Sequence, residues 1–182
     1  MSIDAQRAID TKRVGGRRKV RYRSYQEILD DAHRLAAGPH RSLGNWSLGQ
    51  VLKHLGNAMQ GSVDGQGFPV KWYLRWLGPI VIKPRLIKGP FPAGFRLPLR
   101  AAEKLVARDT TTFDEGMAAL LAGIERLQRE TSRASHPVAG RLTIDEWDQF
   151  HLRHAEMHMS FVVPEEGEAG VRIQEGVEND RR

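Results

Sequence analysis

The sequence contains no cysteine among its 182 residues. That absence excludes a disulfide framework, thiolate zinc sites, iron–sulfur clusters and a cysteine nucleophile. Any bound metal ion would therefore be held by histidine, aspartate or glutamate. The sequence also lacks the run of about 18 apolar residues that a membrane-spanning helix needs, so we expect no membrane partner. Strand patterns are weak throughout the sequence. The apolar run at 80–82 is short and is bounded by prolines.

The charge of the chain is unevenly distributed. The formal net charge of +6 equals that of residues 1–23 alone, which hold eight Lys or Arg and two acidic residues. Residues 71–108 contain nine basic residues and one acidic residue, whereas residues 109–182 contain eight basic and fifteen acidic ones. We interpret residues 1–20 as a basic, flexible N-terminal arm. The arm lacks the apolar core of an export signal, so a cytoplasmic location is expected.

Helix start signals recur along the remaining sequence. Each is a capping box, a Ser or Thr followed three residues later by Glu or Gln, in front of a one-sided apolar pattern. The four pairs are Ser24 with Glu27, Ser47 with Gln50, Thr112 with Glu115, and Thr143 with Glu146. They predict an all-α fold, a four-helix bundle spanning residues 21–163. The Glu- and Gly-rich residues 164–182 are predicted to form a flexible tail.

The interval 62–111 is too long for a tight turn between the second and third helices. We expect a long crossover that contains a short extra helix near 70–77 and one more helical turn near 101–107. Such a crossover lets the two helices that it joins run parallel.

Three of the seven histidines fall on one stripe of the last helix, beside Phe150 and Phe161. They are His151, His154 and His158, and the stripe faces the predicted core. Buried imidazoles are costly unless they are hydrogen-bonded or bound to something. His154 and His158 are four residues apart, so both rings can reach one ion, and His54 lies where the second helix borders the interior. Three histidines from two helices suit zinc, nickel or iron(II) with a coordination position left open.

Several short motifs, taken together over about residues 20–163, resemble the DinB-like superfamily, and more narrowly an uncharacterised bacterial branch of it. The motifs are Gly44-Asn45-Trp46-Ser47-Leu48-Gly49-Gln50 leading to His54, Ser62-Val63-Asp64-Gly65, His136-Pro137, and Leu142-Thr143-x-x-Glu146-Trp147 leading to His154-x-x-x-His158. The resemblance implies a four-helix bundle with a long crossover. It also implies a divalent metal held by His54, His154 and His158.

Two features depart from the superfamily pattern. Many members place Arg or Gln shortly after the second histidine of the pair, where this sequence has Met159-Ser160-Phe161. His151 is an additional ring in the same stripe, either a hydrogen-bonding partner or a substitute ligand. The expected triad remains the one that the resemblance implies.

The resemblance also implies a class of chemistry. Enzymes of the superfamily include transferases and isomerases that use bacillithiol, mycothiol or glutathione. We therefore expect a metal-dependent enzyme that resembles a transferase or a hydrolase and acts on a small molecule. A low-molecular-weight thiol is the expected co-substrate. The candidates for a catalytic residue are His151 and Asp64. Each has a structural alternative, as a buried packed ring and as a turn or capping residue respectively.

The basic middle segment supports an alternative function. Its cations alternate with aromatic residues, a pattern that single-stranded nucleic acid or a membrane surface would use. We favour a simpler interpretation, with the aromatic rings packed inward and the cations solvated. A nucleic-acid-binding stress-response protein is therefore the less favoured function. A third candidate function is a non-catalytic homodimeric bundle whose histidines are only hydrogen-bonded. We also expect the favoured metal-dependent enzyme to be a homodimer. The segment's cations are Lys71, Arg75, Lys83, Arg85, Lys88, Arg96 and Arg100, and its rings are Trp72, Tyr73, Trp76 and Phe91.

Overall fold

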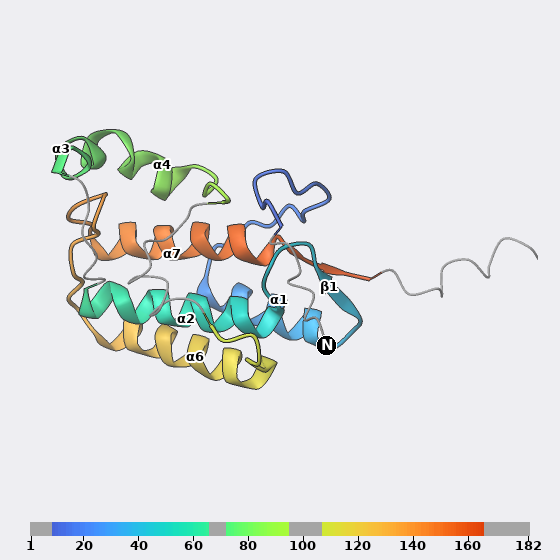
Figure 1. The fold of residues 1–182 in the computed structure, drawn as a ribbon. Coiled ribbons are helices and arrows are strands. Elements are labelled where there is room, and N and C mark those ends of the chain that lie inside the picture. The colour runs from blue at the N-terminus through green and yellow to red at the C-terminus, as the bar shows by residue number, and fades with distance from the viewer. Residues whose placement is uncertain (1–8, 66–71, 95–106, 166–182) are drawn as a thin grey trace, which may run out of the picture.

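The computed structural model describes residues 9–65, 72–94 and 107–165. Over these residues the chain is mostly helical, with six helices and one small two-stranded sheet (Figure 1). The helices are α1 (Tyr25–Ala36), α2 (Leu48–Asp64), α3 (Trp72–Val81), α4 (Lys83–Lys88), α6 (Phe113–Arg129) and α7 (Ile144–Met159). The strands are β1 (His40–Ser42) and β2 (Val162–Pro164). The turn expected near 101–107 lies almost wholly outside the described residues, as do residues 166–182 of the expected tail.

The four longest helices begin at the predicted caps. Ser47, Thr112 and Thr143 each form a complete capping box with the residue three positions later. Ser24 caps α1 by accepting from the Glu27 amide, but the Glu27 carboxylate accepts from the backbone N–H of Arg23 instead of closing the box. Each cap satisfies backbone N–H groups that have no partner inside the helix.

Helices α2 and α6 lie side by side and run in the same direction, as the long crossover predicts (Figure 1). Their contact is built on glycines spaced seven residues apart, Gly49 and Gly56 on α2 and Gly116 and Gly123 on α6. A Cβ added at Gly56 would fall well inside the van der Waals distance of the Ala119 carbonyl oxygen. The two helices therefore approach each other backbone to backbone.

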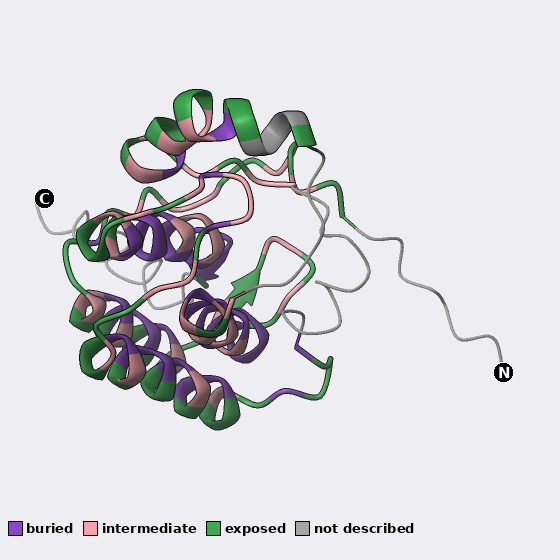
Figure 2. Ribbon diagram, turned by 90° about the vertical axis from the view of Figure 1, so that its left-hand side faces the viewer, coloured by how far each residue is buried: buried purple, intermediate pink, exposed green. Residues whose placement is uncertain are grey.

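Helices α1 and α7 pack against α2 and α6 and complete the apolar core. Figure 2 views the helices end-on and shows their buried residues turned toward one another. One continuous apolar cluster draws on all four long helices, for example Ile28, Leu52, Leu120 and Met159. Helix α7 runs opposite to α2, since His151 meets Ser62 near the end of α2 whereas His158 meets His54 near its middle.

The small sheet was not predicted from the sequence. β1 pairs antiparallel with β2, and Arg41 lies opposite Val163. The sheet ties the segment before α2 to the end of α7, and buries Val162 and Val163. Three-residue strands carry too short an alternation to be recognised in a sequence.

The basic segment before α1 differs in part from the expected flexible arm. The Arg17 guanidinium donates to the Ser160 hydroxyl and lies 4.0 Å from the centre of the Phe161 ring. Arg18 forms a bidentate ion pair with buried Asp31, with N–O distances of 2.9 and 2.7 Å. Both side chains belong to the folded domain. The proposed boundaries at residues 20 and 164 stay predictions.

The extra helix forms where expected, but its two tryptophan rings point the other way, and the side chain of Tyr73 lies outside the described residues. Trp72 and Trp76 are 75% and 77% exposed, so the inward packing predicted for them is wrong. Phe91, which follows α4, does pack inward against Phe150. None of the helices in the described ranges is long and apolar enough to cross a membrane.

Candidate metal centre

Three histidine rings converge between α2 and α7. His54 comes from α2, and His154 and His158 come from successive turns of α7. The Nε2 atom of His154 lies 3.3 Å from Nε2 of His54 and 3.1 Å from Nε2 of His158. One ligand nitrogen from each ring lies within 4.8 Å of the other two. In the described part of the chain this is the one such group, and it contains no carboxylate.

These separations suit a metal ion. Nitrogen ligands bind zinc at about 2.0–2.1 Å, which places neighbouring ligands of a tetrahedral ion about 3.3 Å apart. Octahedral ions of similar size bring neighbouring ligands slightly closer, to about 3.0 Å. The separations of His154 Nε2 from the other two Nε2 atoms fall in this range, so they suit a first-row divalent ion without selecting one.

The environment favours the neutral form of His154 and His158. Burial lowers the pKa of His154 and of His158 well below the ordinary value of 6.5, and the charges of neighbouring rings lower both further. Neutral imidazole is the form that ligates metals. Nδ1 of His154 is buried and has no hydrogen-bond partner.

Aromatic side chains enclose the three histidines. The Trp46 ring stacks on His158, with centroids 5.2 Å apart and planes inclined by 12°. It also contacts the His54 ring. Phe91 approaches His154 from the segment after α4, with centroids 5.0 Å apart, and Phe150 lies beside it. Their packing limits the orientations that the histidines can adopt, while His158 stays partly exposed.

His151 faces a different partner. Its Nε2 lies 3.1 Å from the Ser62 hydroxyl, which itself donates to the backbone oxygen of Met59. His151 Nε2 therefore donates to Ser62 rather than joining the three converging nitrogens. The ring is stacked on Trp147, and burial lowers its pKa to about 3. These contacts are those of a packed, neutral core histidine.

Asp64 is not brought to the histidines. Ten residues of α2, or about 15 Å of helix, separate it from His54. Its carboxylate is exposed and pairs with the Arg126 guanidinium on α6, with one N–O distance of 2.8 Å. This pairing lowers the pKa of Asp64. The carboxylate links the ends of two parallel helices.

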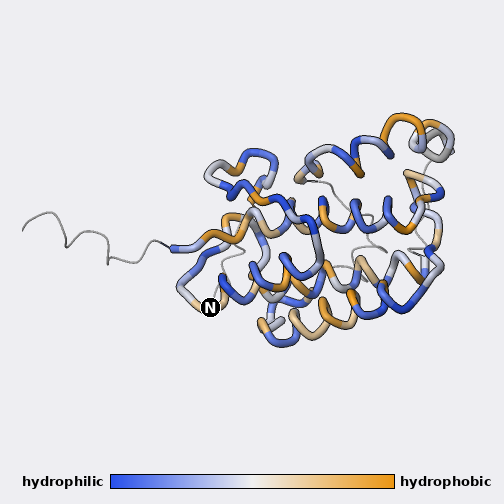
Figure 3. The backbone as a smooth tube through the Cα atoms, turned by 180° about the vertical axis from the view of Figure 1, so that it is seen from behind, coloured by the Kyte–Doolittle hydropathy of each residue, from blue (hydrophilic) through white to orange (hydrophobic). Residues whose placement is uncertain are grey.

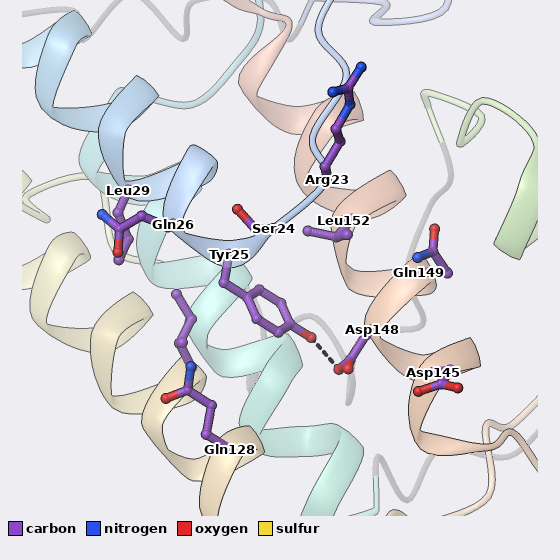
Figure 4. A pocket seen from close by; sticks show the side chains of 11 residues that line it. Arg23, Ser24, Tyr25, Gln26, Leu29, Gln128, Asp145, Asp148, Gln149 and Leu152 are labelled. Atoms are coloured by element: carbon purple, nitrogen blue, oxygen red, sulfur yellow. Dashed lines mark hydrogen bonds between the residues drawn. The ribbon is translucent and has the colours of Figure 1, made fainter.

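A separate cavity of about 430 Å³ opens between α1, α6 and α7 (Figure 4). The Tyr25 hydroxyl donates to Asp148 across it at 2.6 Å. Burial and this hydrogen bond raise the pKa of Tyr25. None of the three converging histidines lines the cavity, so it is distinct from the candidate metal centre.

The chain matches the model of a family described as "Protein of unknown function (DUF1569)" over residues 15–165. It belongs to the DUF1569 family. The matched region includes Arg17 and Arg18, in agreement with their place in the folded domain. It also includes all three histidines of this DUF1569 protein. No curated protein and no solved structure matches the chain.

Sequence reasoning missed the aromatic enclosure. Trp46 had a usable signal, because it directly precedes the cap residue Ser47, and such a residue commonly folds back on the first turns of its helix. Phe91 had none, since it stands in a segment of prolines and glycines without periodicity. Its contact with His154 depends on where α4 packs against α7.

Proposed function

We propose that this DUF1569 protein is a DinB-like four-helix bundle that binds one divalent metal ion through the Nε2 atoms of His54, His154 and His158. The observation that carries the proposal is the spacing of those nitrogens, 3.1 and 3.3 Å from His154 to its two neighbours. One hydrogen bond accounts for only one of the two contacts that His154 Nε2 makes, whereas a shared ion would account for both.

We infer that the site serves a metal-dependent transferase or hydrolase, with a low-molecular-weight thiol as a co-substrate of the transferase reaction. A bound ion with three histidine ligands and an open position lowers the pKa of a coordinated water or thiol and so supplies a nucleophile near pH 7. The chain's own contribution is positional. α2 and α7 hold the ligands, and Trp46, Phe91 and Phe150 limit the orientations of their rings.

The proposal assigns no general base. His151 is engaged with Ser62, and Asp64, at the far end of α2, pairs with Arg126 of α6. Both were candidates from sequence, and neither side chain faces the three histidines. The proposed part of the chain in the reaction is therefore to hold the ion through His54, His154 and His158 and to orient the substrate beside the surrounding aromatic residues.

The alternative of nucleic-acid binding is less favoured by the contacts of the N-terminal segment. Arg17 and Arg18 direct their guanidinium groups at Ser160, Asp31 and backbone carbonyls of α7 and β2. Donors that are used inside the fold are not available to phosphates.

Elemental analysis of the untagged protein, after incubation with Zn²⁺, Ni²⁺ or Fe²⁺ and dialysis, tests the proposal. We expect about one equivalent of metal per chain and its loss in His154→Ala and His158→Ala. His33→Ala is the matched control, since His33 is an exposed histidine on α1 that contacts Phe113. Circular dichroism of each variant verifies that the helices form.

Two results would contradict the proposal. One is wild-type protein that retains none of the three metals. The other is a folded His154→Ala variant that retains as much metal as His33→Ala.

A further inference from the structure

Helix α3 turns small residues toward the protein and large apolar residues toward solvent, which is the reverse of a core helix. Its small residues face the protein, because a Cβ added at Gly78 would collide with the backbone oxygen of Val138, and Pro79 lies against Gly140. The large apolar residues of α3 whose side chains the structure describes face outward. Figure 3 shows this hydrophobic stretch at one end of the molecule. The exposed residues are Trp72, Trp76, Leu77, Ile80 and Val81.

The surroundings of this apolar face are basic. Residues 72–94 contain four Lys or Arg and no acidic residue. Lys83 is paired with Glu146, at 2.8 Å, whereas Arg85 and Lys88 are exposed. We call the five apolar residues together with Arg85 and Lys88 the α3–α4 surface.

We propose that the α3–α4 surface docks on an anionic lipid membrane. A helix that lies in the membrane interface has an apolar face with Trp and aliphatic residues and cations beside it. Tryptophan favours the headgroup region, and each Lys or Arg near an anionic bilayer strengthens binding. The α3–α4 surface has all three components, and α3 is only ten residues long. It would lie on the bilayer rather than cross it. Such docking departs from the expectation of no membrane partner, which was based on spanning helices alone.

Two other occupants fit the surface less well. A second copy of the chain would bring the same cations to a two-fold contact without any acid from α3 or α4 to pair with them. A single-stranded nucleic acid would stack on Trp72 and Trp76, but it gains little from the aliphatic Leu77, Ile80 and Val81. Acyl chains accommodate all five residues.

Vesicle co-sedimentation tests this proposal. We expect the protein to bind mixed phosphatidylcholine–phosphatidylglycerol vesicles and to bind pure phosphatidylcholine vesicles much more weakly, with binding that falls as salt is added. Replacing Arg85 and Lys88 together by Gln should reduce partitioning about thirtyfold. The double variant Trp76→Ser/Ile80→Ser should reduce it at least tenfold, by roughly the apolar area removed.

Leu121→Ser is the matched control, because Leu121 is an exposed apolar residue on α6, away from the α3–α4 surface. It should bind vesicles as the wild type does. Thermal unfolding and metal content are measured on the same samples. Since Trp76 and Ile80 do not contact the three histidines, their replacement should leave both unchanged, so failure here is distinguishable from failure of the metal proposal.

Three outcomes would overturn the proposal. The first is the absence of binding to anionic vesicles at low ionic strength. The second is a dimer, seen by analytical ultracentrifugation, that the Trp76→Ser/Ile80→Ser variant converts to monomers, which would assign the surface to a second copy. The third is oligonucleotide binding that this variant abolishes while vesicles are not bound by the wild type.

Discussion

Trp46 and His158 lie in nearly parallel planes, and this stacking is a consequence of a helix cap. The Ser47 hydroxyl caps α2 by accepting from the backbone N–H of Gln50. This cap turns the residue before Ser47 back toward the helix. The Trp46 ring then covers both His158 and His54. A residue that ligates nothing thus sets the direction of two proposed ligands.

Replacing Trp46 should weaken metal binding without removing it. Residues that orient metal ligands typically contribute ten- to hundredfold to affinity. We expect Trp46→Ala to raise the dissociation constant for Zn²⁺ about tenfold, and Trp46→Phe to change it much less because a ring remains. Competition with a chromophoric chelator measures both. Equal affinity in Trp46→Ala and wild type would show that the stack has no orienting role.

His136 has a structural role that its chemistry makes pH-dependent. Its Nδ1 accepts from the backbone N–H groups of Val138 and Ala139, at 3.1 and 2.9 Å, so the ring must be neutral at that atom. Burial lowers its pKa to about 4. Between about pH 6.5 and pH 4 the unfolded chain binds a proton that the folded chain does not. Stability is therefore lost as the pH falls through this window.

The variant His136→Asn should remove this part of the pH dependence, because its side-chain oxygen can still accept while nothing titrates. Between pH 7.5 and pH 5, His136 should account for a loss of about 2 kcal/mol in the free energy of unfolding. We expect the loss measured by urea unfolding to be smaller by that amount in the variant. His33→Asn serves as the exposed control. An unchanged loss in His136→Asn would assign the pH dependence to other groups, among them His151.

Among the secondary-structure elements, α2 and α6 form the closest contact. A side chain at any of their four facing glycines would meet backbone of the other helix. Glycine in a helix is unfavourable by about 1 kcal/mol relative to alanine. This cost is offset because backbone contact between the two helices brings neighbouring apolar residues, such as Leu52 and Leu120, into one buried cluster.

Replacing Gly56 by Ala should therefore destabilise the protein even though alanine favours helices. The added methyl group must push α6 away from α2, and such overpacking costs about 1–3 kcal/mol. We expect a net loss of roughly 2 kcal/mol in chemical unfolding. Gly38→Ala is the matched control, because nothing lies within 4 Å of its added Cβ, and it should change stability by less than about 0.5 kcal/mol. A Gly56→Ala protein as stable as wild type would mean that the helices separate at no cost.

Sequence periodicity predicted these elements unevenly. The capped helices and the His154–His158 pair follow local rules: a Ser or Thr cap, an apolar stripe and a spacing of four residues. The place of His54 beside this pair was implied by the family resemblance. The orientation of α3 does not follow local rules, because its apolar residues would suit a core equally well. Only the contact of Gly78 and Pro79 with the segment around Val138 decides which face turns inward. Tertiary packing of this kind leaves no local trace in a sequence.

For the molecule as a whole, the segment before α1 fastens the two ends of the fold together. Arg18 contacts Asp31 on α1 and the backbone oxygens of Met159 and Val162 at the end of α7 and in β2. Burial alone would raise the pKa of Asp31, but hydrogen bonds from Arg18 and Tyr22 outweigh it and lower that pKa. A group with a lowered pKa stabilises the fold above its ordinary value of 3.8, and this stabilisation is lost as the pH falls through the lowered pKa.

Removing Arg18 should consequently destabilise the protein as a core substitution would. Arg18→Ala leaves a buried carboxylate with Tyr22 and Arg34 as its remaining partners, and breaking a buried pair typically costs 3–5 kcal/mol. We expect a loss of about 3 kcal/mol at pH 7, measured by urea unfolding. Arg13→Ala, which removes an exposed arginine paired with Asp10, should change stability by less than about 0.5 kcal/mol. If the two variants are equally stable, Arg18 does not stabilise the fold and behaves as part of the solvated arm predicted from the charge pattern.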